Sequence, residues 1–184
     1  KLSAGVLNQG VVLETGPLPV LSLEVWLDRA SENPLVVLLD EVEDPQNAGA
    51  IIRTAAGFGA SAVLFGKDRS APLSPAMVKA SAGGVEDGDL VRVNNLVRAI
   101  ESLKKTGIRV VGLAGEASRS VWNCDFSGAL CIAIGSEGRG LRRLVRQSCD
   151  ELVSIPMSGT LKSFNASVSA AIAIAEYARQ RQSS

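Results

Sequence analysis

The sequence predicts an α/β domain built on a parallel sheet with helices on both faces. Runs rich in Val, Leu and Ile alternate with segments of helical periodicity along most of the chain. The runs are apolar at nearly every position, which is typical of strands that are buried on both faces. Strands and helices that alternate along a chain indicate a parallel sheet.

Three strand and helix pairs are expected in the first half of the domain. The run Leu-Val-Val-Leu-Leu-Asp follows Pro34 and predicts a strand at 35–40. Further strands are expected at the apolar runs 62–65 and 90–93. Apolar residues at helical spacing predict three helices, at 48–58, 74–81 and 96–105.

The second half of the domain continues this alternation. Its strands are expected at 109–113, 130–135 and 151–155, and its helices at 141–148 and 167–180. The last helix consists largely of alanine and other small residues. Small residues on several faces favour close packing against another helix, in the same chain or in a second subunit.

Residues 1–33 are interpreted as a linker, and the domain proper as 34–184. Within this linker only 10–14 has the pattern of a strand, and 21–30 is weakly helical. Glycines and prolines interrupt the rest of it, at Gly5, Gly10, Gly16, Pro17 and Pro19.

Composition places the chain among globular proteins. Its 184 residues are 46% hydrophobic and 21% charged, which suffices for one domain with a sizeable core. No apolar run reaches the roughly 18 residues that cross a bilayer, and no signal peptide is recognisable, so we expect a cytoplasmic protein without a membrane segment. The net charge is zero, so a nucleic acid would have to bind at a local basic surface.

The cysteine and histidine content excludes several kinds of site. Cys124, Cys131 and Cys149 are an odd number without CxxC spacing, so neither a disulfide framework nor a zinc site is expected. We expect Cys131 to be buried in a strand. The chain has no histidine, which excludes Ser-His-Asp and Cys-His catalysis and removes the commonest metal ligand.

Ligands of parallel α/β sheets bind beyond the carboxyl ends of the strands, and three polar loops are expected there. The first loop, 40–49, leads into a helix that carries Arg53. Asn47 lies near the expected N-cap of this helix, and Pro45 stiffens its entry. The pattern fits a capped helix with a solvated arginine as well as part of a functional site.

The second loop follows the strand at 130–135 and reads Gly-Ser-Glu-Gly-Arg-Gly. Its three glycines allow positive φ and close approach of a ligand, and the following helix N-terminus favours anions. A nucleotide or phosphate site is therefore plausible, although the spacing GxxGxG differs from the dinucleotide pattern GxGxxG. The segment 159–163 is not a P-loop, because no glycine directly precedes Lys162.

Four arginines follow or belong to this loop, and their spacing predicts that they share one face of the helix at 141–148. A stripe of this kind fits a solvated surface, but it is also the best phosphate-binding candidate in the chain. The residues are Arg139, Arg142, Arg143 and Arg146.

The third loop, 155–167, lies between a strand and the last helix. Ser163 and Asn165 have the residue types and the position of helix caps. Taken alone, this loop predicts only the start of a helix.

In chain order, the three loops resemble the motifs of the SpoU (TrmH-like) family of RNA ribose 2′-O-methyltransferases. The pattern DPxNxGxxxRTA is similar to residues 44–55, GxEGxGL to 135–141 and IPMxGxxxSLNxSxAAAI to 155–172. Residues 79–84 also match a family segment, and 8–12 look like the linker after a small RNA-binding domain in the ribosomal-RNA branch. Four positions outside the polar motif residues depart from the usual family residue: Asn8, Gly84, Phe164 and Ala166.

The resemblance implies a Rossmann-like parallel sheet with a C-terminal deep trefoil knot, the SPOUT class of fold, in which S-adenosylmethionine binds in a bent form. It also implies that 1–33 follow an N-terminal RNA-binding domain that is absent from this sequence. The cofactor-binding residues implied by position are Leu113, Ala114, Gly115, Ile134, Gly135, Glu137, Gly138, Gly140, Ile155, Met157, Ser163 and Asn165.

The implied catalytic residues are Arg53, Asn47, Glu137, Ser163 and Asn165. In the family the equivalent of Arg53 has been assigned the role of base. A guanidinium holds its proton strongly, so Arg53 could instead bind the substrate phosphate and stabilise developing charge. Asn47 and Ser163 would orient the ribose, Asn165 would hold the loops together, and Glu137 would fix Arg53 or the knot.

The resemblance further implies a homodimer with active sites at its interface, no metal, and RNA as the partner. The RNA would bind at Arg139, Arg142, Arg143 and Arg146. The ribosomal-RNA branch favours guanosine in large-subunit ribosomal RNA, with transfer RNA as the alternative. Two other classes are considered. A non-catalytic RNA-binding module would not need the five polar residues, and a phosphate-binding nucleotide enzyme would need a P-loop lysine or a metal-binding carboxylate in register.

Overall fold

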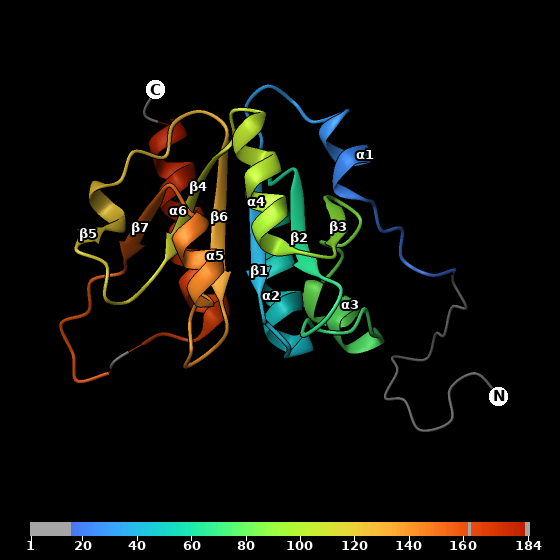
Figure 1. Cartoon of the computed structure of the whole chain (residues 1–184). Helices are drawn as coiled ribbons and strands as arrows, with labels where there is room; N and C mark the ends of the chain where they lie inside the picture. Colours follow the sequence, from blue (N-terminus) through green and yellow to red (C-terminus); the bar gives the residue numbers. More distant parts are fainter. Residues whose placement is uncertain (1–15, 162, 183–184) are drawn as a thin grey trace.

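The computed structural model describes residues 16–161 and 163–182, and these form a seven-stranded parallel sheet between two layers of helices (Figure 1). The sheet has the strand order β3-β2-β1-β6-β4-β7-β5. In chain order the strands are β1 (Leu35–Asp40), β2 (Ala62–Gly66), β3 (Asp89–Val93), β4 (Arg109–Leu113), β5 (Arg119–Ser120), β6 (Leu130–Gly135) and β7 (Glu151–Ser154).

Three helices cover each face of the sheet. The α-helices are α1 (Leu23–Leu27), α2 (Pro45–Gly57), α3 (Pro75–Ser81), α4 (Leu96–Lys105), α5 (Arg143–Ser148) and α6 (Ala166–Gln182), and a short 3-10 helix, η1, spans Val121–Asn123. Helices α1, α4 and α5 pack on one face, and α2, α3 and α6 pack on the other.

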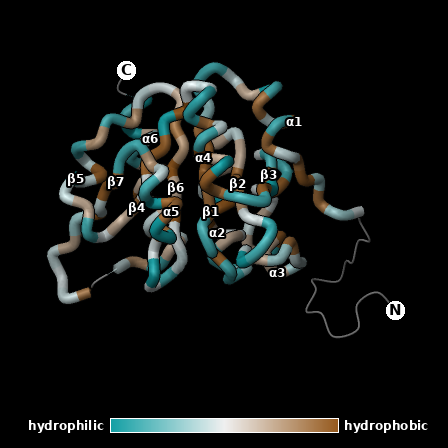
Figure 2. The backbone as a smooth tube through the Cα atoms, viewed as in Figure 1, coloured by the Kyte–Doolittle hydropathy of each residue, from teal (hydrophilic) through white to brown (hydrophobic). Residues whose placement is uncertain are grey.

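The central strands are buried on both faces. Along β1, Val36 and Leu38 belong to the core under α4, whereas Val37 and Leu39 belong to the core under α2. All six residues of β1 are buried. Figure 2 accordingly shows the hydrophobic residues gathered on the strands and on the helix sides that face them. The predicted parallel sheet with two covered faces is confirmed.

The start of α2 differs from the prediction because a capping side chain determines it. Helix α2 begins at Pro45, earlier than predicted, because the Asp44 side chain caps it by accepting from the backbone N–H of Gln46 and Asn47. Asn47 is therefore inside the first turn, and its predicted position at the N-cap is wrong. Strand β5 and helix η1 were not predicted, since elements of two and three residues leave no periodicity in the sequence.

Part of the predicted linker packs on the domain. Leu21 pairs in parallel with Val91 and extends the sheet edge at β3, and Trp26 is 1% exposed in the core under α1. Arg29 forms an ion pair of 2.5 Å with Asp89 at the start of β3. The predicted strand at 10–14 lies outside the described residues. That 1–33 follow another domain stays a prediction.

The described helices include none that is both long enough and apolar enough to cross a membrane.

Helices α2 and α3 approach closely at Gly49. A Cβ atom on Gly49 would lie 2.5 Å from the Ala80 Cβ and 2.5 Å from the Met77 carbonyl oxygen. Neither neighbour can move away alone, because both belong to the body of α3. The glycine of the first motif is thus required by packing, and this packing holds α2 against α3 on one face of the sheet.

Gly49→Ala should lower the free energy of unfolding by about 1–3 kcal/mol, because the added methyl group overpacks the contact with α3. Gly57→Ala is the matched control in the same helix, since a Cβ there would meet no atom within 4 Å. It should be neutral or stabilising by up to about 1 kcal/mol. Urea unfolding monitored by circular dichroism measures both, and equal effects of the two substitutions would contradict this role of Gly49.

Candidate functional site

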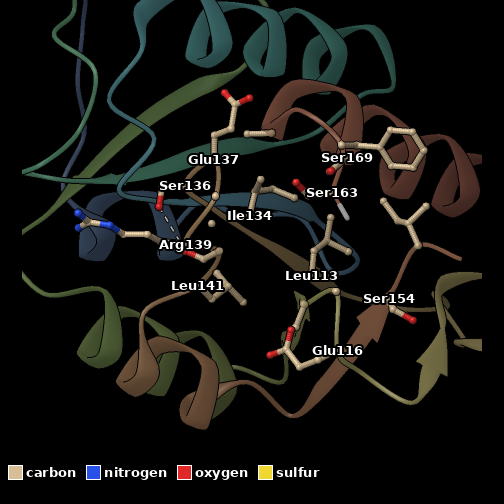
Figure 3. Close-up of a pocket in the computed structure, with 18 of the residues that line it drawn as sticks. Leu113, Glu116, Ile134, Ser136, Glu137, Arg139, Leu141, Ser154, Ser163 and Ser169 are labelled. Carbon is tan, nitrogen blue, oxygen red and sulfur yellow. Dashed lines mark hydrogen bonds between the residues drawn. The ribbon is translucent and has the colours of Figure 1, made fainter. Parts of the chain in front are cut away.

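A cavity of about 440 Å³ opens at the carboxyl ends of β4, β6 and β7. Three loops that are far apart in the sequence surround it, after Leu113, after Ile134 and after Val153 (Figure 3). They meet because parallel strands end at the same edge of the sheet. In Figure 1 the loops that follow β6 and β7 lie at the lower edge of the sheet.

All but one of the predicted cofactor-binding residues line this cavity. They are Leu113, Ala114, Gly115, Ile134, Gly135, Glu137, Gly138, Gly140, Ile155, Met157 and Ser163, and the exception is Asn165. Ile134 and Ile155 give the cavity apolar walls, and the glycine loop offers backbone N–H and C=O groups. Such a mixture of apolar walls and a few polar groups is typical of sites for small organic ligands.

Several lining residues were not predicted. Glu116, Ser136 and Ser154 follow or end the strands around the cavity, so the carboxyl-end rule could have found them. Ser169 lies one helical turn after Asn165, and helical spacing could have found it. Leu161 and Phe164 carry no signal in the sequence that separates them from ordinary loop residues.

The glycine loop, residues 135–141, is a closed turn that only glycines permit. A Cβ on Gly135 would overlap the backbone of Gly140 and Leu141. Gly138 and Gly140 have φ of 81° and 67°, in the left-handed region that other residues rarely adopt. The Gly140 N–H donates to the Ser136 carbonyl at 2.9 Å and closes the loop. The predicted positive φ is confirmed at Gly138 and Gly140, and Gly135 is required by the loop's own backbone. Close approach of a ligand stays a prediction.

Asn165 joins all three loops through its side-chain amide. Its Nδ2 donates to Asn47 Oδ1 at 3.0 Å and to Glu137 Oε2 at 3.5 Å. Its Oδ1 accepts from the N–H of Ser167 at 2.8 Å and from the Ser167 hydroxyl at 2.6 Å. Asn165 therefore caps α6 and also tethers the other two loops, so both roles considered for it are present.

The tether fixes the orientation of Asn47. Because Asn47 Oδ1 accepts from Asn165, its Nδ2 faces elsewhere, and no bond joins that Nδ2 to another described residue. Ser163 is exposed and lines the cavity, as Glu137 does. The Ser163 hydroxyl is thus available to a ligand in the cavity, and the Asn47 amide is linked to the cavity wall through Asn165 and Glu137.

Arg53 is not part of this cluster within one chain. It is exposed on α2, and no ion pair or hydrogen bond joins its side chain to another described residue. Six helical residues place it about 9 Å further along the helix axis than Asn47 and on a different side of α2. The structure therefore brings together four of the five predicted catalytic residues and leaves Arg53 apart.

The predicted arginine stripe on one helical face is wrong. Helix α5 begins only at Arg143, so Arg139 lies in the glycine loop and Arg142 at the N-cap. Arg142 Nε donates to the buried carboxylate of Asp40 at 2.6 Å. Arg146 forms an ion pair with Glu116, and Arg143 donates to Gln147 at 3.4 Å. Three of the four side chains thus have different partners, and Arg139 lies in the glycine loop away from the helical face formed by Arg143 and Arg146.

The cysteines are not candidate nucleophiles. Burial raises the pKa of the Cys124 and Cys149 thiols to about 11, and it raises the pKa of Cys131 well above the usual range. Cys131 is 0% exposed in β6, which confirms the prediction that it is buried in a strand. The three thiols stay protonated at neutral pH, and a protonated thiol is a poor nucleophile.

Comparison with known proteins identifies relatives along nearly the whole chain. The model of the SpoU rRNA methylase family matches residues 34–175. A 23S rRNA (guanosine-2′-O-)-methyltransferase, RlmB, from Pseudomonas putida is 46% identical over 178 residues, which are 95% of this chain and 72% of that protein. The RlmB protein of Photobacterium profundum is 42% identical and covers 97% of this chain and 74% of its own length.

Solved structures of the same family share the fold. The SpoU methyltransferase AviRb from Streptomyces viridochromogenes, in complex with the cofactor AdoMet, has a TM-score of 0.78 and 33% identity. The match covers 85% of this chain and 64% of that chain, so this chain spans less than two thirds of the AviRb length. Another solved structure, which concerns the 2-OH methylation of C/U34 on tRNA, has a TM-score of 0.75 and 29% identity. That match covers 83% of this chain and 99% of the other chain.

Asn165→Asp should separate the capping role of Asn165 from its tethering role. The aspartate keeps an oxygen for the Ser167 N–H, so the free energy of unfolding should change by less than about 1 kcal/mol. It loses the donor to Asn47 and sets a second carboxylate against Glu137, so the affinity for S-adenosylmethionine should fall roughly tenfold. Thermal unfolding and isothermal titration calorimetry measure the two effects.

Asn165→Ala is the control that removes both roles, and it should lose affinity and also about 1 kcal/mol of stability. If Asn165→Asp bound S-adenosylmethionine as tightly as the wild type, Asn165 would be a helix cap only.

Proposed function

This chain belongs to the SpoU rRNA methylase family, and from that premise we propose that it transfers the methyl group of S-adenosylmethionine to a ribose 2′-hydroxyl of RNA. The proposed substrate is guanosine in large-subunit ribosomal RNA, as in the RlmB relatives, and the proposed location is the cytoplasm. The observation that carries the proposal is the cavity at the sheet edge. The glycine loop lines it, and Asn165 ties that loop to Asn47.

The residues of the cavity fit the cofactor. Leu113, Ile134 and Ile155 offer apolar surface for an adenine ring, and a ligand can approach the backbone at Gly138 and Gly140, where a Cβ would meet no atom within 4 Å. S-adenosylmethionine supplies a methyl group on a sulfonium, which is already activated for transfer. The protein therefore has to align the ribose hydroxyl and assist the loss of its proton. Threading of the C-terminal segment as a trefoil knot stays a prediction.

The chain's own polar groups divide these tasks. The hydroxyl of Ser163 lines the cavity, and the Nδ2 of Asn47, which has no partner among the described residues, is tied through Asn165 to Glu137 of the cavity wall, so both groups can hold a ribose. The Arg53 side chain has no partner among the residues that the structure describes, and it can bind a phosphate of the RNA through two parallel N–H donors. A guanidinium that holds the phosphate also stabilises charge that develops as the hydroxyl loses its proton. We favour this role for Arg53 over that of a base.

The active protein is proposed to be a homodimer, for two reasons. Helix α6 carries an outward row of apolar residues at helical spacing, Val168, Ala171, Ile172 and Ala175, of which Val168 is 44% exposed. Arg53 lies outside the cavity of its own chain, so a second copy is needed if Arg53 is to act at a site. A twofold contact through α6 would bury the apolar row.

A direct assay tests the proposed activity. Tritium from labelled S-adenosylmethionine should appear in 23S ribosomal RNA and be found at a guanosine 2′-oxygen after nuclease digestion. Transfer RNA is the comparator, because the tRNA-related structure makes it the second candidate substrate. We expect calorimetry to detect binding of S-adenosylmethionine, also with EDTA present, and no comparable binding of ATP. Binding of ATP alone would overturn the proposal in favour of a nucleotide enzyme.

Arg53→Ala should leave the affinity for S-adenosylmethionine nearly unchanged while methyl transfer falls by roughly two orders of magnitude or more. Arg53→Lys should recover only part of the rate, because lysine keeps the charge but lacks the planar pair of donors. Arg98→Ala is the control, since Arg98 is likewise exposed on a helix and unpaired among the described residues. Full activity of Arg53→Ala would reduce Arg53 to a solvated helix residue.

Ala171→Arg should convert the dimer into monomers, because a charged side chain would be placed in the apolar row on α6. Ala76→Arg is the matched control at an exposed position on α3 and should not change the association. Sedimentation velocity measures both. A wild-type protein that sediments as a monomer would contradict the proposed dimer.

A further inference from the structure

The carboxylate of Asp40 is fully buried at the end of β1 and has two partners from a single residue. Asp40 Oδ2 accepts from the backbone N–H of Arg142 at 2.7 Å, and Oδ1 accepts from Arg142 Nε at 2.6 Å. Asp40 is 0% exposed, so without these bonds its carboxylate would lie unpaired in a protein interior. No role proposed above uses Asp40.

Asp40 lies beside the start of the glycine loop and is hydrogen-bonded to the residue that follows its end. In the ladder between β1 and β6, Asp40 is the register partner of Gly135, where the loop begins. Arg142 directly follows Leu141, where the loop ends. The Asp40 side chain therefore fixes the stem where the loop ends, and the backbone ladder of β1 with β6 fixes the stem where it begins. The antiparallel bridge between Ser136 and Gly140 closes the neck between them.

A second carboxylate supports this arrangement. Glu41 has φ of 57°, a conformation that is uncommon for residues other than glycine, and its Oε1 lies 3.5 Å from Arg142 Nε. The same oxygen accepts from Arg69 at 2.9 Å. The Arg142 side chain, 45% exposed, is thus drawn toward the end of β1 by two acidic residues and is not free to follow an RNA backbone.

We propose that Asp40 is a positioning residue for the cofactor, which acts through Arg142 by holding the glycine loop in the shape that binds S-adenosylmethionine. The loop is then fixed at its base by Asp40 and at its tip by the bond from Asn165 to Glu137. A loop held at both ends needs little ordering when the ligand binds, and this ordering would otherwise weaken affinity. The inference rests on the proposed function, since it takes S-adenosylmethionine as the ligand of the cavity.

Asp150 provides a matched control for a purely structural carboxylate. Its Oδ2 accepts from the backbone N–H of Val110 at 2.8 Å, and its Oδ1 pairs with Lys104 at 2.6 Å. It therefore has the same two kinds of partner as Asp40. It precedes β7 and contacts the start of β4, so it lies at the edge of the sheet opposite the cavity.

Asp40→Asn should raise the Kd for S-adenosylmethionine roughly tenfold or more, while kcat at saturating cofactor stays within about threefold. Asp150→Asn should lower the melting temperature as well, yet keep the Kd within about twofold. Calorimetry well below both melting temperatures measures the affinities. Hydrogen exchange should show faster exchange of the amides of residues 136–140 in Asp40→Asn only. Wild-type affinity in Asp40→Asn, or equal weakening in Asp150→Asn, would overturn the inference.

Arg142→Gln keeps the test decisive if Asp40→Asn does not fold. It retains the backbone N–H to Asp40 and changes a half-exposed side chain, and it should weaken cofactor binding severalfold. The double variant Asp40→Asn/Arg142→Gln should bind no more weakly than Asp40→Asn alone, because the two residues act as one unit. If the double variant lost the sum of the two single losses of binding free energy, Asp40 and Arg142 would not act as one unit. Failure of the wild type to bind S-adenosylmethionine would refute the proposed function itself, whereas normal wild-type binding with unaffected variants refutes only the role of Asp40.

Discussion

The parallel register of β1 with β6 is the constraint on which the site depends. It sets Asp40 beside Gly135, so that the first motif and the glycine loop leave the sheet at the same edge. The same direction of β7 delivers the third loop there, and Asn165 then bonds to residues from both others. A change of strand direction or a slip of register would separate these groups. The close packing of α2 on α3 at Gly49 also fixes the position of α2, the helix that carries Asn47.

Charge in this protein is arranged in pairs and is not spread over a surface. The net charge is zero, and most arginines around the cavity have acidic or amide partners, as Arg142 has Asp40 and Arg146 has Glu116. Paired arginines hold loops in place, and a paired guanidinium has less to offer a phosphate than a free one. Arg53 is one of the exceptions among the described residues, which is why its position on α2 matters more than the number of basic residues near the cavity.

Periodicity was sufficient to predict the sheet and nearly all its elements, because apolar runs and helical spacing are local properties. The proposed cofactor residues came from the resemblance to the SpoU family, and all but Asn165 line one cavity. Prediction from local sequence failed where a contact with another residue or strand determines the cap, the side-chain direction or the strand. Asp44 and not Asn47 caps α2, Arg142 turns toward a carboxylate that precedes it by 102 residues, and β5 exists only because β7 offers it an edge. Asn165 shows why capping and function were hard to separate, since one amide performs both with different atoms.

The separation of Arg53 from the cavity has a consequence for how such a site can work. The groups that hold the loops are bonded within one chain, so a cofactor site can be complete before any partner binds. The groups proposed to bind RNA are the Nδ2 of Asn47, the hydroxyl of Ser163 and the guanidinium of Arg53, none of which has a partner among the described residues. Arg53 lies on a different side of α2 from Asn47. If these groups act on one RNA, a second subunit would have to bring them together, and the apolar row on α6 is the part of the described fold that could do so. Cofactor binding would then depend on the fold of each subunit, whereas methyl transfer would depend on assembly as well.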